Sequence, residues 1–393
     1  MPRFDDAGEP LPPLYDAGPA PAQPCAEGIR RVSIDIPSRL TRERRRIPRI
    51  VGDGTRVLVA DLDETSIEGT VLGRLSRADA LTGEVEWTTD VALPLSSRTN
   101  WPAPIGIRAV DGGWEVAWAQ AHAEWLGAIV RFEADGTASE PIPFDHPPGN
   151  ELRDIRAGTD SADGFLLSAG MLVSITETST RAAPIAADSA TGTWWGAGWV
   201  DDGELSRPNA SGNVVGIFRR FADDGVGPTR MVVTSIDPLR WGEPLSLVEL
   251  EDLEVRDVQH AAVVTVQGGT LAGVSQGPPI GLTLHWLDDA LRERARASVA
   301  PASAEGGVHL VGAAGAPPWQ AVALARVDVG IDVLFGIVRE EGNVDGVMRP
   351  ILTVPDRDIP HTAVLWSSAP RTFHVGWWRG DLEVLTFSCE GAR

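Results

Sequence analysis

The sequence contains no lysine, and all 34 of its basic residues are arginine. Without lysine, the chain can form neither a lysine Schiff base nor the lysine-containing phosphate loop of nucleotide hydrolases. The 55 acidic residues bring the formal net charge to −21. Because an acidic surface of this size repels phosphate backbones, we expect no binding to nucleic acid.

Long apolar runs are also missing. A membrane-spanning helix needs a run of about 18 or more apolar residues, and the sequence has none. Residues 5–25 are rich in Asp, Ala, Gly and Pro, a composition that cannot pack a core. We therefore expect no membrane span, a low-complexity and disordered tail over residues 1–28, and a single domain over residues 29–393.

The tail resembles the spacer that follows the lipid-anchored cysteine in many Gram-negative surface lipoproteins. The resemblance implies a bacterial protein that is secreted, periplasmic or on the cell surface, with its signal and lipid anchor removed. A cytoplasmic protein with a disordered tail is the alternative. The oligomeric state is left open, with a monomer favoured.

Cysteine is scarce: Cys25 and Cys389 are the only two, and they lie near opposite ends of the chain. A disulfide between them would close a very long loop, which the chain-entropy model values at about 4–5 kcal/mol. Such a bond would indicate that the protein resides in an oxidising compartment. Two unrelated thiols are the alternative.

What the sequence does contain is many short alternating runs separated by turns. It has 42 glycines and 30 prolines, and turn signals stand at residues 111–113, 134–136, 267–269 and 341–343. This pattern is typical of short strands joined by tight hairpins. Only Asp288 to Ser298 is compatible with a helix, and it fits an outer strand equally well.

An Arg-Asp pair followed by Ile or Val recurs at residues 153–155, 256–258 and 357–359, at separations of 103 and 101 residues. Half of this spacing is about 51 residues, enough for the four strands of a propeller blade. We therefore predict an all-β propeller of seven four-stranded blades, with six or eight left open. The expected blades are 48–98, 99–148, 149–188, 189–252, 253–302, 303–355 and 356–391, with Ile29 to Ile36 closing the last blade as its outer strand.

Residues 78–87, ADALTGEVEW, resemble the repeat of quinoprotein-like β-propellers. A poorer copy occurs at residues 187–195. The resemblance implies blade architecture, with Trp87 docking between neighbouring blades, and it does not imply a quinone cofactor.

The Arg-Asp pairs also give the first candidate ligand site. If all three lie at one end of the propeller, their side chains could form a ring that binds an anion or a sugar, and two histidines follow the second and third pairs at equal spacing. The candidate residues are Arg153, Asp154, Arg256, Asp257, Arg357, Asp358, His260 and His361. Ion pairs between blades are the alternative role. A sialidase is excluded, because its nucleophile is a tyrosine and the only tyrosine is Tyr15 in the tail.

Motifs for other chemistry are weak. Ser275 lies in a nucleophile-elbow string, but Pro278 and Pro279 prevent the helix that the elbow needs, so we expect a turn there. No cofactor is predicted, although the acidic residues at 61–63 and 201–204 leave calcium open.

These observations favour a non-catalytic propeller of the cell envelope or extracellular space that binds a protein or a glycan. The alternative is a glycan-active hydrolase or lyase that uses paired carboxylates in the central channel.

Overall fold

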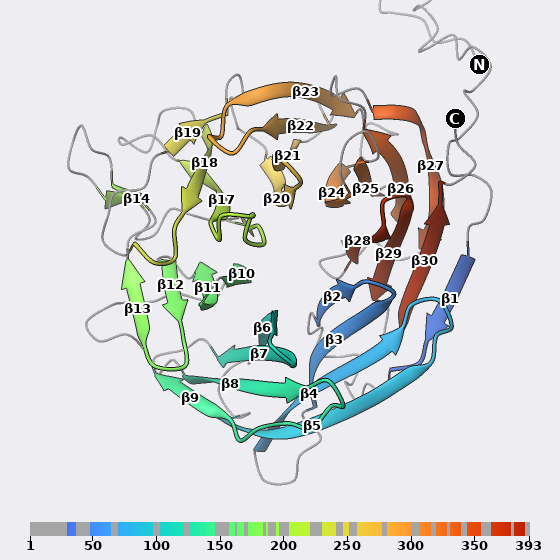
Figure 1. Ribbon diagram of the computed structural model, residues 1–393. Coiled ribbons are helices and arrows are strands. Elements are labelled where there is room, and N and C mark those ends of the chain that lie inside the picture. Colours follow the sequence, from blue (N-terminus) through green and yellow to red (C-terminus); the bar gives the residue numbers. More distant parts are fainter. Residues whose placement is uncertain are drawn as a thin grey trace, which may run out of the picture.

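The computed structural model is an all-β ring of four-stranded antiparallel sheets arranged around a central axis (Figure 1). The structure describes residues 30–36, 48–63, 70–96, 103–120, 126–145, 157–161, 163–168, 172–183, 186–187, 194–195, 204–220, 230–240, 247–250, 258–276, 281–299, 307–315, 320–327, 331–338, 344–354, 363–378 and 381–389. Seven sheets have four strands each, which confirms the predicted seven-bladed propeller.

The first three blades follow one another along the chain, each from its innermost to its outermost strand. Blade 1 consists of β2 (Arg49–Asp53), β3 (Arg56–Asp63), β4 (Thr70–Asp79) and β5 (Val85–Ser96). Blade 2 consists of β6 (Ala103–Val110), β7 (Gly113–Gln120), β8 (Leu126–Glu133) and β9 (Ile142–Asp145). Blade 3 consists of β10 (Ala157–Ser161), β11 (Gly164–Ser168), β12 (Leu172–Ile175) and β13 (Thr180–Ala183).

A separate two-stranded sheet of β14 (Ala186–Ala187) and β15 (Trp194–Trp195) precedes blade 4. Blade 4 consists of β16 (Glu204–Leu205), β17 (Val214–Arg220), β18 (Arg230–Ile236) and β19 (Leu247–Glu249). Blade 5 consists of β20 (Val258–Val266), β21 (Gly269–Gln276), β22 (Gly281–Leu287) and β23 (Glu293–Val299). Blade 6 consists of β24 (Gly307–Ala314), β25 (Gln320–Val327), β26 (Ile331–Val338) and β27 (Val344–Val354).

Blade 7 closes the ring by combining the two ends of the chain. Its three inner strands are β28 (Ala363–Ala369), β29 (Thr372–Trp378) and β30 (Leu382–Ser388), and its outer strand is β1 (Arg30–Ile34). The register runs antiparallel from Arg30 opposite Thr386 to Ile34 opposite Leu382. Figure 1 shows β1 and β30 side by side. This arrangement confirms the predicted closure by an N-terminal strand.

The apolar core is divided among the junctions between blades. Strand residues alternate between the two faces of a sheet, so each blade presents one apolar face to the blade before it and one to the blade after it. Each of the seven clusters of buried hydrophobic residues accordingly combines residues of two adjacent blades. At the closing junction, for example, Ile34 and Trp366 of blade 7 pack with Val57 of blade 1.

Three of the four predicted glycine turns lie in the described residues. Gly112, Gly136 and Gly268 have φ angles of 81°, 88° and 81°, in the left-handed region that favours glycine. Each follows the end of a strand in a hairpin, as the alternating pattern predicted. The fourth turn, at residues 341–343, lies outside the described residues.

Trp87 docks on the next blade, as its resemblance to the quinoprotein-like repeat implied. Its indole Nε1 donates to the carbonyl oxygen of Ala134 at 3.2 Å, and its ring lies 6.0 Å from that of Trp114. Both partners belong to blade 2, whereas Trp87 is on β5 of blade 1. The contact fixes the outer edges of the two blades together.

The structure decides two open questions of secondary structure, one at residues 288–298 and one at Ser275. The segment that fitted a helix or an outer strand contains the outer strand β23. The turn expected at Ser275 was wrong, because Ser275 lies within β21 and is fully buried. Its neighbours in the strand are also buried, so an apolar environment on both faces favours β structure over a turn here.

Candidate functional site

The predicted Arg-Asp ring lies almost entirely outside the described residues. This holds for Arg153, Asp154, Arg256, Asp257, Arg357, Asp358 and His361. His260 belongs to β20, where its backbone pairs with Ser275, and its side chain is not described. The strands that follow the three pairs, β10, β20 and β28, are the innermost strands of blades 3, 5 and 7. The alternate-blade spacing therefore has a structural basis, and the ring as a ligand site stays a prediction.

The predicted disulfide has one described partner. Cys389 follows β30 directly, has no exposed surface, and belongs to the cluster between blades 6 and 7. Its backbone N–H donates to the carbonyl oxygen of Arg371 at 2.9 Å. Cys25 lies outside the described residues, so the bond itself stays a prediction.

The described turns gather at one end of the propeller, here named the turn face. In blades 1 to 6, strands one and two, and likewise strands three and four, are connected at this end. Side-chain oxygens brace several of the outer turns: Asp79, Asp237 and Asp288 each accept hydrogen bonds from backbone N–H groups that follow them. The N–H of Arg292 is the leading reason that the pKa of Asp288 is lowered. The turn face is therefore a preorganised surface.

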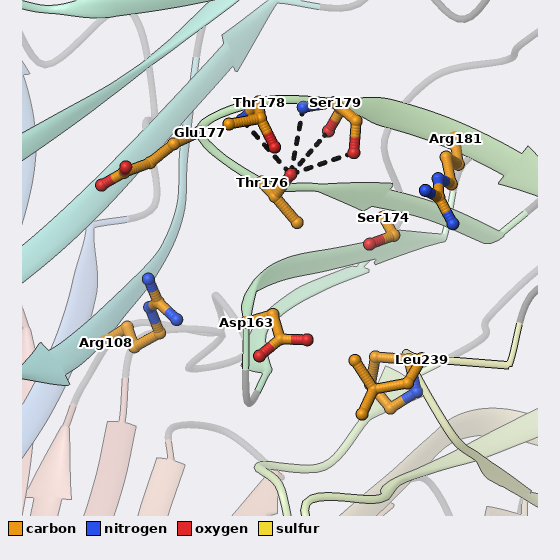
Figure 2. Close-up of a pocket in the computed structure, with 10 residues that line it drawn as sticks. Arg108, Asp163, Ser174, Thr176, Glu177, Thr178, Ser179, Arg181 and Leu239 are labelled. Carbon is orange, nitrogen blue, oxygen red and sulfur yellow. Dashed lines mark hydrogen bonds between the residues drawn. The ribbon is translucent and has the colours of Figure 1, made fainter.

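The turn face is hollowed at blade 3. A cavity of about 530 Å³, here named the blade-3 hollow, lies at the end of that blade (Figure 2). Residues of both turns of blade 3 line the cavity, together with one arginine of blade 2 and two residues from the outer turn of blade 4. The lining residues are Arg108, Asp163, Ser174, Thr176, Glu177, Thr178, Ser179, Arg181, Pro238 and Leu239.

The hollow has a simple geometric cause. The strands of blade 3 have five, five, four and four residues, whereas β6, β7 and β8 of blade 2 have eight each and β17 and β18 of blade 4 have seven each. A strand that lacks three residues is shorter by about 10 Å, at roughly 3.3 Å per residue. The hollow thus lies at a blade whose strands are short beside the longer strands of blades 2 and 4 named above.

Arg108 forms one wall of the hollow and is held by a buried carboxylate. It lies directly opposite Glu115 in the β6–β7 register, and its Nε donates to Glu115 Oε2 at 3.1 Å. A second bond joins Nη2 to the same oxygen. The side chains are 16% and 3% exposed, so Glu115 neutralises Arg108 in a setting poor in water. Arg108 is therefore fixed in position before any ligand arrives.

The opposite wall is the turn between β12 and β13. Thr176 Oγ1 accepts hydrogen bonds from the N–H groups of Ser179 at 3.0 Å and Thr178 at 3.4 Å, and its hydroxyl donates to the Ser179 carbonyl oxygen at 3.2 Å. These bonds close the turn from inside, as Figure 2 shows. The exposed side chains of Glu177 and Thr178 are consequently presented by a braced backbone.

Three charged side chains in the hollow have no partner. Asp163, Glu177 and Arg181 are all exposed, and within the described part of the chain they form no hydrogen bond or ion pair. Figure 2 shows Arg181 and Leu239 toward one end of the hollow, Glu177 and Arg108 toward the other, and Asp163 between them. Leu239 is 64% exposed, which is unusual for a large apolar side chain in this protein. The hollow thus combines both signs of charge with one apolar contact.

Arg49, on the inner side of the ring, is influenced electrostatically by Glu204. Arg49 and Glu204 begin the innermost strands of blades 1 and 4. Burial lowers the pKa of Arg49, and the Glu204 carboxylate partly counteracts this. The Nε of Arg49 also donates to the carbonyl oxygen of Pro104 at 3.4 Å.

No metal-binding centre is found in the described ranges. Among those residues, no three His, Cys, Asp or Glu side chains are grouped closely enough to hold a metal ion. Some of the acidic residues considered for calcium binding can be placed. Asp61 is buried in β3, and its carboxylate accepts a hydrogen bond from the N–H of Leu62, whereas Asp201 and Asp202 lie outside the described residues. The described chain also contains no helix long and apolar enough to cross a bilayer.

The sequence predicted none of the residues of the blade-3 hollow. One signal was available: the expected blade at 149–188 was shorter than its neighbours on both sides. A short blade in a ring of longer ones predicts a recess, and the polar turns at its ends then become the lining. These turns were not predicted to form a site, because Thr-Glu-Thr-Ser at 176–179 matches no catalytic or ligand-binding motif.

No protein-family model matches the chain, and no curated protein matches it. Solved structures of similar shape include a protein of unknown function from Dyadobacter fermentans, with 10% identity, a TM-score of 0.48, and coverage of 92% of this chain and 99% of that one. Trypanosoma rangeli sialidase in complex with sialic acid has 10% identity and a TM-score of 0.45, and the match covers 94% of this chain and 60% of that chain. BBS1N, in a complex with ARL6DN, has 11% identity and a TM-score of 0.45, with 88% and 92% coverage. Similarity at this level says nothing about a ligand.

Proposed function

We propose that this protein is a non-catalytic binding propeller whose ligand, a protein or a glycan, occupies the blade-3 hollow. The observation that carries the proposal is the set of three exposed charged side chains, Asp163, Glu177 and Arg181, around one braced cavity, none of which is paired with another described residue. The cavity volume is within the range of small-ligand and side-chain binding sites. A location in the cell envelope or outside the cell is part of the proposal and rests on the tail composition.

The hollow suits binding better than chemistry. Among the described residues, its lining contains hydroxyls, carboxylates and guanidinium groups but no His, Cys or Tyr that could act as a base or nucleophile. Arg108 is already neutralised by Glu115 and fixed by it. A rigid site of this kind loses little conformational entropy when a ligand binds.

A glycan-active enzyme is the second candidate, and one observation favours it. Asp163 and Glu177 both line the hollow, and a glycosidase uses two carboxyl groups across the scissile bond. One of the two must be kept protonated by burial in order to act as the acid. Both side chains are exposed, so we rank this candidate second.

The experiment that tests the proposal is a binding screen with a blocked site. The full chain is screened against a glycan array and a random peptide library, and each hit is measured again on Thr178→Arg, which fills the hollow with a long side chain. The turn is retained, because the Thr178 side chain forms none of its hydrogen bonds. Ser211→Arg, on an exposed turn of blade 4, is the matched control.

We expect binding that survives in the control and is lost in Thr178→Arg. Hits that bind both variants as tightly as the natural chain would show that the ligand site is elsewhere. Slow hydrolysis of a glycan hit that is abolished by Asp163→Asn would instead favour the enzyme.

A further inference from the structure

The charges of the blade-3 hollow restrict what can fill it. A ligand that covers Asp163, Glu177 and Arg181 removes water from them, and desolvated charges are costly unless the ligand supplies opposite charges. None of the three has a partner of its own among the described residues. The ligand must therefore bring cations to the two carboxylates and an anion to the guanidinium.

Among the described residues, the lining also lacks the flat aromatic side chains that sugar-binding sites usually contain. Sugar rings have apolar C–H faces, which proteins usually cover with flat aromatic side chains. The ten lining residues include no aromatic residue. The apolar surface at the hollow is instead Leu239, a branched aliphatic side chain that is 64% exposed. Such a side chain suits contact with another aliphatic or aromatic side chain.

The charges are also separated in space. Figure 2 shows Glu177 at the end near Arg108, Asp163 in the middle, and Arg181 with Leu239 at the other end. Because Arg108 is already paired with Glu115, the first two positions are acidic and the last is basic and apolar. A rigid small anion or cation could satisfy one end only, whereas an extended chain of varied side chains can satisfy both.

We infer that the occupant is an extended polypeptide segment with a Lys or Arg over Asp163 and Glu177, and with an Asp or Glu next to an apolar residue over Arg181 and Leu239. This inference rests on the proposed function, since it names the partner of the same site. The net charge of −21 supports the basic part of the segment, because a basic partner is drawn to this protein at long range.

The test is selection of random 12-residue peptides, displayed on phage, against the full chain. Selected peptides are then synthesised, and their Kd values are measured by fluorescence polarisation on the natural chain, on Thr178→Arg and on three further variants. Asp163→Asn with Glu177→Gln removes the acidic end. Glu84→Gln with Glu140→Gln removes two exposed acidic residues elsewhere on the turn face and is the matched control. Arg181→Glu reverses the basic end.

We expect enriched peptides to share a basic residue and an acidic–apolar pair. Their Kd rises at least tenfold on the Asp163–Glu177 variant and less than twofold on the control. Replacing the peptide's acidic residue by Lys weakens binding to the natural chain and restores binding to Arg181→Glu. This charge exchange identifies Arg181 as the contact.

Three outcomes overturn the inference, and they distinguish it from the proposed function. If only glycans bind and Thr178→Arg abolishes that binding, the occupant is a glycan and the proposed function stands. If peptides bind equally to all variants, including Thr178→Arg, both the occupant and the site are wrong. If no peptide is enriched above an unrelated acidic protein, the hollow does not accept a peptide.

Discussion

Arg30 of β1 lies opposite Thr386 of β30, so the first and last described strands of the chain are neighbours in blade 7. This register comprises five residue pairs in all and ends with Ile34 opposite Leu382. The ring is therefore closed by noncovalent pairing between the two ends, and its stability should depend on β1.

The first prediction concerns this closing strand. Ile34 has no exposed surface and belongs to the cluster between blades 7 and 1. Replacing it with Ala leaves a cavity, so Ile34→Ala should lower the free energy of unfolding by about 2–4 kcal/mol. Urea titration checks this, with Ser33→Ala, at an exposed position of the same strand, as a control that changes stability by less than about 0.5 kcal/mol. Equal stability of both variants would mean that β1 does not hold the ring.

The second prediction concerns the covalent closure. Cys389 directly follows β30 at the turn face, where the other blades have a turn between strands three and four. A bond to Cys25, which precedes β1 by a few residues, would replace that missing turn. Reduction should then lower the unfolding midpoint of the natural chain, by a loss on the order of 5 kcal/mol, and leave Cys389→Ser unchanged. Two reactive thiols in the unreduced, denatured protein would contradict the bond.

The third prediction concerns the buried ion pair beside the hollow. Removing the Glu115 carboxylate takes away the oxygen that accepts two hydrogen bonds from the Arg108 guanidinium in a water-poor site. Glu115→Ala should therefore cost about 3 kcal/mol of stability. Glu133→Ala is the control, because Glu133 pairs with Arg131 on the surface, with side chains 51% and 41% exposed, and such pairs contribute about 0.5 kcal/mol or less. Calorimetry or urea unfolding distinguishes the two.

The fourth prediction is a pH dependence of folding. His374 is fully buried, stacks on Trp366 at 5.0 Å, and contacts Thr386 Oγ1 at 2.9 Å and Ser368 Oγ at 2.7 Å. Burial lowers its pKa from 6.5 to about 4. The folded state thus favours neutral His374, so its contribution is complete above pH 6.5 and is lost as the pH falls toward 4.

The size of this loss follows from the pKa difference, at about 3 kcal/mol. The measurement is urea unfolding of the natural chain and of His374→Gln between pH 7 and 4.5. Burial also lowers the pKa of His285, which remains in both proteins, so the difference between the two curves isolates His374. Parallel curves would show that His374 does not titrate on unfolding in this range.

The sequence predicted the blades well, because strand alternation and glycine turns are local signals. Gly112, Gly136 and Gly268 marked true turns, and the closing strand was expected within residues 29–36. The prediction of a turn at Ser275 was wrong, because the turn indicated by Pro278 and Pro279 was extended to include Ser275. Its actual strand, β21, is buried on both faces and lacks the alternation that identifies half-buried strands.

The blade-3 hollow could not be predicted from sequence motifs. It depends on the length of blade 3 relative to blades 2 and 4, which is a property of the ring and not of any short segment. Arg108 and Leu239 are distant in sequence and meet at the hollow only because their blades flank the short one.

The most direct test of the central claim places a photoreactive residue at the hollow. Leu239 is replaced by p-benzoyl-phenylalanine, and the variant is irradiated with the best peptide or glycan from the screens. The control carries the same residue at Ile142, the other exposed large hydrophobic residue of the described chain, which is 37% exposed and lies on blade 2. We predict crosslinking at position 239, suppressed by excess unlabelled ligand, and none at position 142. Equal crosslinking at both positions, or none at 239 while binding persists, would contradict a ligand in the blade-3 hollow.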